Sequence, residues 1–229
     1  HTNLLFCLSA LPELSEEIIF EEFCRWGTFH ADPLHNQAFS FQNKQKNKQI
    51  LRIGYISPDF RLHAAAGGIE LLFKHHDHSQ FEVFAYSDVR QPDMVTTRIQ
   101  SLVTCWREVV SLSNQQLAEL IQQDQIDILV DLAGQTEHNR LLVFARKPAP
   151  LQVTGFGFVC TTGLKQMDYR ISDQWVTPPE TVHRNTEKIL YLSSMLHWTP
   201  PHFEKTITPV PALKNGYITF GCANGVYKL

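Results

Sequence analysis

The stretch that decides the fold runs from Leu51 to Gly68 and reads LRIGYISPDFRLHAAAGG. It opens with the mainly apolar segment Leu51–Ile56, a pattern typical of a strand buried in a sheet. A Ser-Pro-Asp turn follows, and the run of Ala and Gly after His63 leads into an expected helix over about residues 65–75. A buried strand that turns into a helix is the beginning of a βαβ unit.

The same alternation continues along the chain. A serine followed by two glutamates, Ser15–Glu17, marks the start of a helix that reaches Trp26. Further helices are expected over 95–106, 114–124 and 139–146, and further strands over 81–86, 126–132, 152–158, 169–172, 189–192 and 217–221. The run ILVDLA at 128–133 is almost wholly apolar, as in a parallel strand covered on both faces. The sequence therefore predicts an α/β fold with a Rossmann-like, doubly wound sheet.

Composition excludes several classes of protein. The chain has 229 residues, of which 43% are hydrophobic and 19% charged, which is typical of a folded globular protein. Its net charge of −3 lacks the basic footprint of a nucleic-acid binder. We find no apolar run of membrane-spanning length and no secretory signal, so no membrane partner is expected. Five scattered cysteines without a CxxC pair favour reduced thiols and a cytoplasmic location.

Candidate chemistry lies where ligands bind in an open parallel sheet, beyond the carboxyl ends of the strands. Asp59 and His63 follow the first strand, and this pair could orient a substrate hydroxyl or stabilise charge. Alternatively, Asp59 caps the turn and His63 only fills the first turn of the helix. Spacing alone leaves both interpretations open. No GxGxxG or GxxxxGK[ST] motif is present, so a dinucleotide site or a P-loop has no support.

Several long motifs occur in a fixed order along the chain. They are LRIGYISPDFRLHA, FEVFAYS, QIDILVDLAGQTEHNRLLVFARKPAPLQVT, TTGLKQMDYRISD and the closing FGCANGVYKL. Together they resemble the catalytic region of the O-GlcNAc transferase family, which includes bacterial homologues and the plant Spindly proteins. The opening HTNLLFCLSALPELS is similar to the segment that joins the tetratricopeptide repeats of that family to its catalytic core.

The resemblance implies the N-terminal lobe of a GT-B-type glycosyltransferase. Residues 1–49 would be a helical connector from upstream repeats, and residues 50–201 the catalytic lobe. Residues 202–229 would be a linker and the start of the nucleotide-binding lobe. We therefore expect a fragment, truncated at both ends and inactive alone.

The activity that the resemblance implies is transfer of GlcNAc from UDP-GlcNAc to Ser or Thr hydroxyls of proteins, with inversion at the anomeric carbon. The partners would be a nucleotide-sugar donor and a protein or peptide acceptor. No metal or other cofactor is expected, because a lysine and helix-end amides can hold the leaving diphosphate. The cluster KHHDH at 74–78 suits the end of a helix better than a metal site.

Site residues carry over from the resemblance position by position. His63, Asp59 and His1 match residues beside the reacting groups. Lys228 and Asn224 match the loop that approaches the donor diphosphate. The remaining matches are Phe156 and Gly157 in the sugar pocket, with Thr161 and Thr162 as contacts to phosphate or acceptor, or alternatively as helix caps.

The chain departs from the family pattern in the same region. It reads GFGFVCTTG at 155–163 where the family usually has WLGYPGTTG, and Gln135 stands where many members have histidine. These differences touch the pocket rather than the sheet. They motivate two alternatives: a donor such as GDP-fucose or UDP-glucose, or a degenerate repeat-linked scaffold that binds without catalysis.

Overall fold

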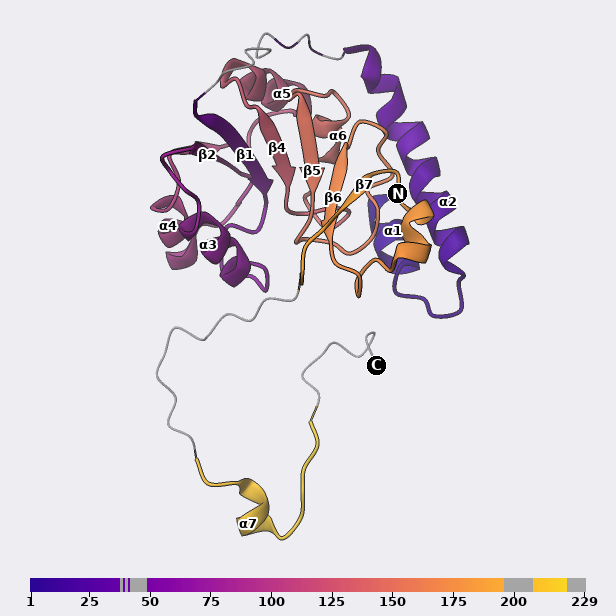
Figure 1. Cartoon of the computed structure of the whole chain (residues 1–229), viewed down its shortest axis with the longest axis vertical. Coiled ribbons are helices and arrows are strands. Elements are labelled where there is room, and N and C mark those ends of the chain that lie inside the picture. Colours follow the sequence, from indigo (N-terminus) through magenta and orange to yellow (C-terminus); the bar gives the residue numbers. More distant parts are fainter. Residues whose placement is uncertain (38, 40, 42–48, 196–207, 222–229) are drawn as a thin grey trace. The chain divides into compact units, whose positions relative to one another are not determined.

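The fold was examined in a computed structural model, which describes residues 1–37, 39, 41, 49–195 and 208–221 (Figure 1). The chain divides into two compact units, residues 1–197 and 198–229. Each unit is considered by itself. The first contains the whole sheet, and the second contributes one short helix, α7 (Pro211–Asn215).

The first unit is built on a seven-stranded sheet in which every neighbouring pair is parallel. Its spatial order is β3-β2-β1-β4-β5-β6-β7. The strands are β1 (Leu51–Ser57), β2 (Phe81–Ser87), β3 (Cys105–Glu108), β4 (Ile128–Asp131), β5 (Leu151–Thr154), β6 (Tyr169–Ser172) and β7 (Lys188–Tyr191). The order reverses between β1 and β4, which makes this pair the topological switch point of a Rossmann-type sheet.

Helices cover both faces of this sheet. They are α1 (Thr2–Leu8), α2 (Glu16–Trp26), α3 (Ala66–Lys74), α4 (Met94–Gln100), α5 (Asn114–Gln123) and α6 (Leu141–Phe144). A π-helical turn, Gly27–Ala31, and a 3-10 helix, Asp32–Gln37, follow α2, and another 3-10 helix, Pro179–Arg184, precedes β7. The predicted doubly wound α/β fold is confirmed.

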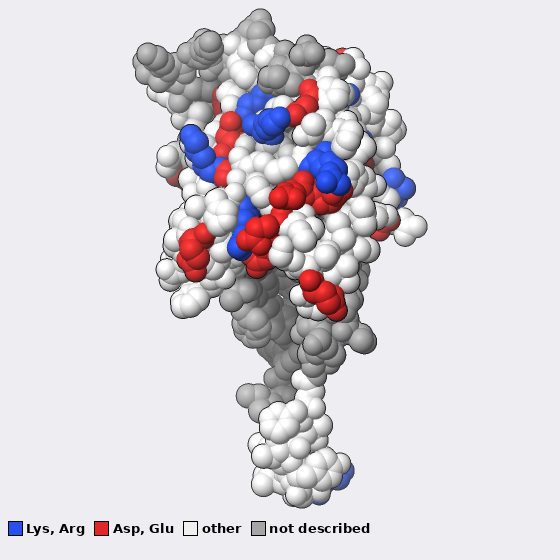
Figure 2. All heavy atoms as spheres, turned by 90° about the vertical axis from the view of Figure 1, so that its right-hand side faces the viewer, with Lys and Arg blue, Asp and Glu red and all other residues white. Residues whose placement is uncertain are grey.

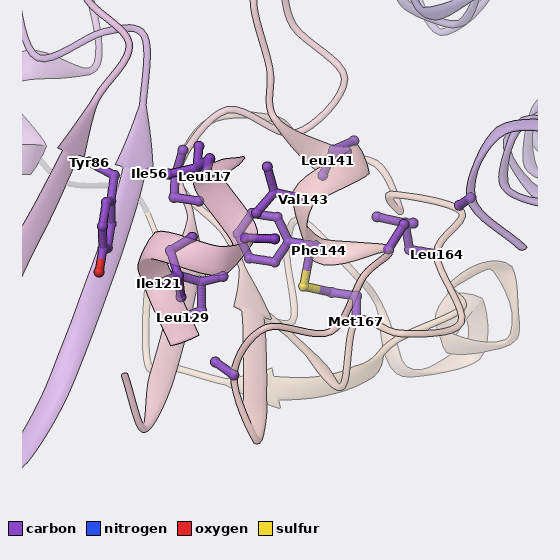
Figure 3. Close-up of a cluster of buried hydrophobic side chains, with 14 of the residues drawn as sticks. Ile56, Tyr86, Leu117, Ile121, Leu129, Leu141, Val143, Phe144, Leu164 and Met167 are labelled. Carbon is purple, nitrogen blue, oxygen red and sulfur yellow. The ribbon is translucent and has the colours of Figure 1, made fainter. Parts of the chain in front are cut away.

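Alternation along the strands explains the two covered faces, because successive side chains point to opposite sides. Ile56, Tyr86 and Leu129 join one apolar cluster with helices α5 and α6 and with the N-terminal helices (Figure 3). The adjacent Tyr55 and Ala85 join a second cluster with α3 and α4. Continuous apolar strands therefore have a partner layer on each side.

Three sequence predictions need correction. The helix expected over 95–106 ends at Gln100, and residues 105–108 form the edge strand β3 instead. This strand is defined by its pairing with β2, from Phe84↔Cys105 to Ser87↔Glu108, which local sequence does not reveal. The strand expected over 217–221 does not form, since no described strand pairs with it. A strand needs such a neighbour to satisfy its backbone hydrogen bonds.

The strand expected over 152–158 is also shorter than predicted and ends at Thr154. Phe156 has φ +70°, in the left-handed region, so the extended backbone cannot continue through it. The segment after β5 therefore turns away from the sheet earlier than the sequence suggested, and this changes the positions of the residues expected in the sugar pocket.

Candidate active site

A cavity of about 790 Å³ lies at the carboxyl ends of β1, β2 and β4. Three segments that follow these strands contribute to it: the β1 loop (residues 58–65), the β2 loop (88–93) and the β4 loop (132–140). Helix α1 adds Asn3, Phe6 and Cys7. This switch-point cavity is where a parallel α/β sheet of this order binds its ligands.

The β1 loop brings the predicted pair Asp59 and His63 into this cavity. Ser57 shapes the turn, because its Oγ accepts a hydrogen bond of 3.0 Å from the Asp59 N–H. Phe60 anchors the loop, since its ring is fully buried and lies 5.7 Å from the ring centroid of Phe73. The fold thus fixes the backbone of this loop while its polar side chains line the cavity.

Asp59 and His63 lie close together but are not hydrogen-bonded to each other. His63 Nδ1 lies 3.7 Å from Asp59 Oδ2, and the side chains are 40% and 12% exposed, respectively. Nδ1 also accepts a hydrogen bond of 3.3 Å from the Ala65 N–H. The second oxygen of Asp59 is 3.6 Å from Arg61 Nη2. Both contacts to the carboxylate are longer than hydrogen bonds, so a small movement would close either of them.

The β4 loop is held in place by a buried carboxylate. Asp131 accepts hydrogen bonds from the Ala133 N–H (3.1 Å), the Gly134 N–H (2.8 Å) and Thr154 Oγ1 (2.7 Å). Burial raises the pKa of the Asp131 carboxyl, and these hydrogen bonds oppose that shift. Gly134 adopts φ +59°, a conformation that favours glycine. The loop therefore presents residues 135–138 to the cavity in a fixed conformation.

The β2 loop was not singled out by the sequence analysis, yet it supplies Asp88, Arg90 and Gln91 to the same cavity. Arg140 holds Asp88 by two hydrogen bonds, from Nε at 3.0 Å and from Nη2 at 2.9 Å. Such a bidentate pair satisfies the carboxylate. The rule that identified the β1 loop, a polar segment at the carboxyl end of a strand, would have found this loop as well.

His1 lies beside this cavity rather than in it. It lines a neighbouring cavity of about 450 Å³ that shares Asn3 and residues 136–138 with the first. Its Nε2 donates to Glu22 Oε1 at 2.9 Å, because a carboxylate only accepts. Its Nδ1 then accepts from Nε2 of His30 at 3.1 Å. Both ring nitrogens of His1 are thus engaged within the fold.

The residues predicted after β5 lie elsewhere and do not line the switch-point cavity. Phe156 packs partly buried against the α3 and α4 cluster. Gly157 allows a close approach of two backbones, because a Cβ atom there would lie 2.0 Å from the Leu132 carbonyl oxygen. Gly157 therefore brings the β5 loop (155–163) against the β4 loop.

Thr161 and Thr162 are buried and bonded to Glu187, a residue that sequence reasoning missed. Thr161 Oγ1 donates to Glu187 Oε2 at 2.7 Å, and the Thr162 N–H donates to Oε1 at 2.8 Å. The Thr162 hydroxyl also donates to Oε1. These contacts use the groups that a phosphate or an acceptor would need. No sequence signal links the threonines to a carboxylate 25 residues later.

Lys228 and Asn224, predicted to approach the donor diphosphate, lie outside the described residues. Within the described part of the chain, no group of three or more His, Cys, Asp or Glu side chains is arranged to hold a metal ion. No helix in that part is long and apolar enough to cross a membrane. Figure 2 shows one face, on which acidic and basic side chains are interspersed rather than gathered by sign.

Comparisons with known proteins show the family to which the chain belongs. SPINDLY of Arabidopsis thaliana, named a probable UDP-N-acetylglucosamine–peptide N-acetylglucosaminyltransferase, is 36% identical over 99% of this chain and 25% of its own length. The Caenorhabditis elegans UDP-N-acetylglucosamine–peptide N-acetylglucosaminyltransferase is 37% identical over 69% of this chain and 14% of its own length. The chain thus spans about a quarter or less of these curated relatives.

A solved structure of a mutant O-GlcNAc transferase from Thermobaculum terrenum superposes with a TM-score of 0.80. It is 35% identical, and the match covers 84% of this chain and 37% of that one. The likeness extends to the fold class, since that protein is a GT-B-type transferase. The profile described as Glycosyl transferase family 41 matches residues 23–202, which is most of the chain. The chain belongs to glycosyl transferase family 41.

Proposed function

We propose that this chain supplies the N-terminal catalytic lobe of an inverting protein O-glycosyltransferase that moves GlcNAc from UDP-GlcNAc to Ser or Thr hydroxyls. The observation that carries the proposal is the Asp59–His63 pair on the switch-point cavity of a family 41 chain. The names of the relatives supply the donor and the peptide acceptor.

His63 and Asp59 have the chemistry that the acceptor step requires. In the structure the Ala65 N–H donates to His63 Nδ1, which puts the proton of the neutral ring on Nε2. If Nδ1 exchanges this contact for a hydrogen bond to Asp59 Oδ2, the ring proton lies on Nδ1 and Nε2 can accept the proton of an attacking hydroxyl. Asp59 then stabilises the imidazolium that forms. The present distance of 3.7 Å is typical of a catalytic contact that tightens only when substrate is bound. His1, held by Glu22 and His30, would support the adjoining wall.

The remaining roles rest on the family resemblance. Lys228 and Asn224 would bind the leaving diphosphate, where negative charge develops in the transition state. Phe156 and Gly157 border the sugar in the family resemblance; here they do not line the switch-point cavity, and they would act on it through the conformation of the β5 loop. Thr161 and Thr162 would act through the conformation of the β5 loop, because their hydroxyls are already bonded to Glu187.

We also propose that transfer needs no metal, that tetratricopeptide repeats precede this lobe, and that the protein works in the cytoplasm. The domain boundaries at residues 49 and 201 remain predictions of the same kind. Transfer that is unchanged by a chelator such as EDTA is the expected result for the first of these proposals. Loss of transfer with EDTA and its recovery with Mg²⁺ would contradict it.

The test uses a protein in which residues 1–229 are continued by the segment that follows the matched region in the relatives. It is incubated with UDP-GlcNAc and a Ser/Thr-rich peptide pool, and HexNAc addition is measured by mass spectrometry. We expect transfer, and a loss of roughly 100-fold or more in His63→Ala. A matched control is His78→Ala, an exposed histidine beyond the end of α3, which should transfer normally.

A different donor is the second candidate, favoured by the altered β5 loop. Gly155 replaces the usual tryptophan of the family, and even a Cβ atom at this position would lie 3.1 Å from Ile171 Cβ. The β5 loop is therefore built differently here. Transfer from GDP-fucose or UDP-glucose but not from UDP-GlcNAc would favour this candidate. Saturable UDP binding without transfer from any of the three donors would instead indicate a non-catalytic binding protein.

A further inference from the structure

Gln135 carries an unused hydrogen-bond acceptor on the switch-point cavity. Its side chain is fully buried, and it lines the cavity from the β4 loop. Its Nε2 donates to the Thr162 carbonyl oxygen at 3.0 Å. Its Oε1 has no hydrogen-bond partner within the described part of the chain. A buried acceptor without a partner is costly, so its presence on a cavity indicates a partner that arrives with a ligand.

The orientation of this amide is set by its neighbour. The Thr162 carbonyl can only accept, so the NH₂ group of Gln135 must face it and Oε1 must face away. The group left for a ligand is therefore an acceptor. It suits an O–H or N–H group and repels an anion such as phosphate.

The Thr162 carbonyl is itself well fixed. Glu187 accepts from the Thr162 N–H at 2.8 Å and from Thr161 Oγ1 at 2.7 Å, and all three residues are buried. A chain of contacts thus runs from Glu187 through Thr162 to Gln135 and ends at the cavity. Pre-organisation of this kind holds a binding group in place before the ligand enters.

Two other buried glutamines show why the cavity matters. Gln152 and Gln166 also have Oε1 atoms without a partner among the described residues. Neither residue lines the switch-point cavity, so their unused acceptors are a matter of packing. Gln135 differs because, of these three glutamines, it is the one that lines that cavity.

We propose that Gln135 Oε1 accepts a hydrogen bond from an O–H or N–H group of the bound substrate, and that the Thr162–Glu187 contacts position it. The proposal rests on the proposed function, which supplies two sources of such a group. One is a hydroxyl or the acetamido N–H of the donor sugar. The other is a backbone N–H of the acceptor peptide.

The test compares Gln135→His with Gln135→Met in the extended protein. Neutral histidine keeps one donor for the Thr162 carbonyl and one acceptor for substrate, whereas methionine keeps neither. At pH 8 we expect kcat/KM near the wild-type value in Gln135→His and roughly tenfold or more lower in Gln135→Met. Melting temperatures measured in parallel show whether each variant is folded.

The pH profile separates a binding role from a structural one. A protonated imidazole still donates to Thr162 but no longer accepts, so kcat/KM of Gln135→His should fall relative to wild type below a pH of about 6.5. The other titratable groups on the cavity are identical in both proteins and cancel in this ratio. They are Cys7, Asp59, His63, Asp88, Glu137 and His138, beside the cations Arg61 and Arg90. A ratio that stays constant with pH would overturn the proposal.

Substrate analogues then identify the source. Suppose that the group belongs to the sugar. The wild-type protein should then have a lower kcat/KM for one donor analogue, which lacks a single hydroxyl or the acetamido N–H, than for UDP-GlcNAc. Gln135→Met should have the same kcat/KM for that analogue as for UDP-GlcNAc. If it belongs to the acceptor, an N-methylated peptide should behave in this way. Either result supports the proposal, and additive losses for every analogue contradict it.

Two controls keep the outcomes distinct. Gln152→Met removes a similarly buried acceptor away from the cavity and should leave KM and the pH profile unchanged. If the wild-type protein transfers sugar and Gln135→His follows the wild-type profile, the role of Gln135 alone is wrong. If the wild-type protein transfers no sugar from any donor, the proposed function fails, and this inference fails with it.

Discussion

The β1 loop and the β5 loop both carry residues that the sequence marked as functional, but the fold treats them in opposite ways. In the β1 loop, Asp59 and His63 line a cavity and make contacts of 3.6–3.7 Å, longer than hydrogen bonds. In the β5 loop, Thr161 and Thr162 are buried and bonded to Glu187. Polar residues near strand ends therefore fall into two groups. Some face the cavity in which substrate would bind, and others hold those residues in position.

The largest effect is expected from Asp59→Asn in the β1 loop. An amide keeps the shape but cannot stabilise a protonated His63, so kcat should fall about 100-fold while the melting temperature changes little. Steady-state kinetics and a thermal melt check this prediction. An unchanged kcat would show that the carboxylate only caps the turn. The role of Asp59 in the β1 loop would then be structural, like that of the threonines in the β5 loop.

In the β5 loop, Glu187→Gln should act on stability first. The amide cannot accept every hydrogen bond that the carboxylate receives from Thr161 and Thr162, so buried donors lose their partner. We expect the free energy of unfolding to fall by about 2 kcal/mol, measured by urea denaturation. A variant as stable as wild type would contradict the structural role of this carboxylate.

A finer separation comes from Thr162→Val, which removes only a hydroxyl. If that hydroxyl serves Glu187, the free energy of unfolding should fall by about 1 kcal/mol with little change in KM for the donor. The alternative interpretation, a contact to phosphate, predicts a raised KM at unchanged stability. Measuring both quantities on one protein preparation decides between them.

The smallest effect lies away from both loops, at His76. Burial lowers the pKa of this imidazole, and its Nε2 is 2.7 Å from the Tyr55 hydroxyl. Because the folded protein resists protonation, the unfolded chain binds more protons as the pH falls below about 6.5, and stability falls with it. In His76→Gln the melting temperature should depend less on pH between 5 and 7. Equal pH dependence in both proteins would contradict this assignment.

Much of the fold was predictable because the sheet is covered on both faces and each strand is an apolar run between helices. The edge strand β3 was not, because Cys105–Glu108 is a strand only through its pairing with β2. In the site, Asp59 and His63 followed from the rule on strand ends. Glu187 and the Arg140–Asp88 pair depend on contacts between distant segments, which no local pattern encodes.

The contrast between the two loops can be measured most directly by amide hydrogen exchange on the extended protein, with and without saturating UDP and acceptor peptide. We expect residues 58–65 to gain protection when substrate binds, because Asp59, Arg61 and His63 line the cavity. Residues 161 and 162, already bonded to Glu187, should be protected beforehand and change little. Protection gained at 161 and 162 with none at 58–65 would contradict the proposed division of roles between the two loops.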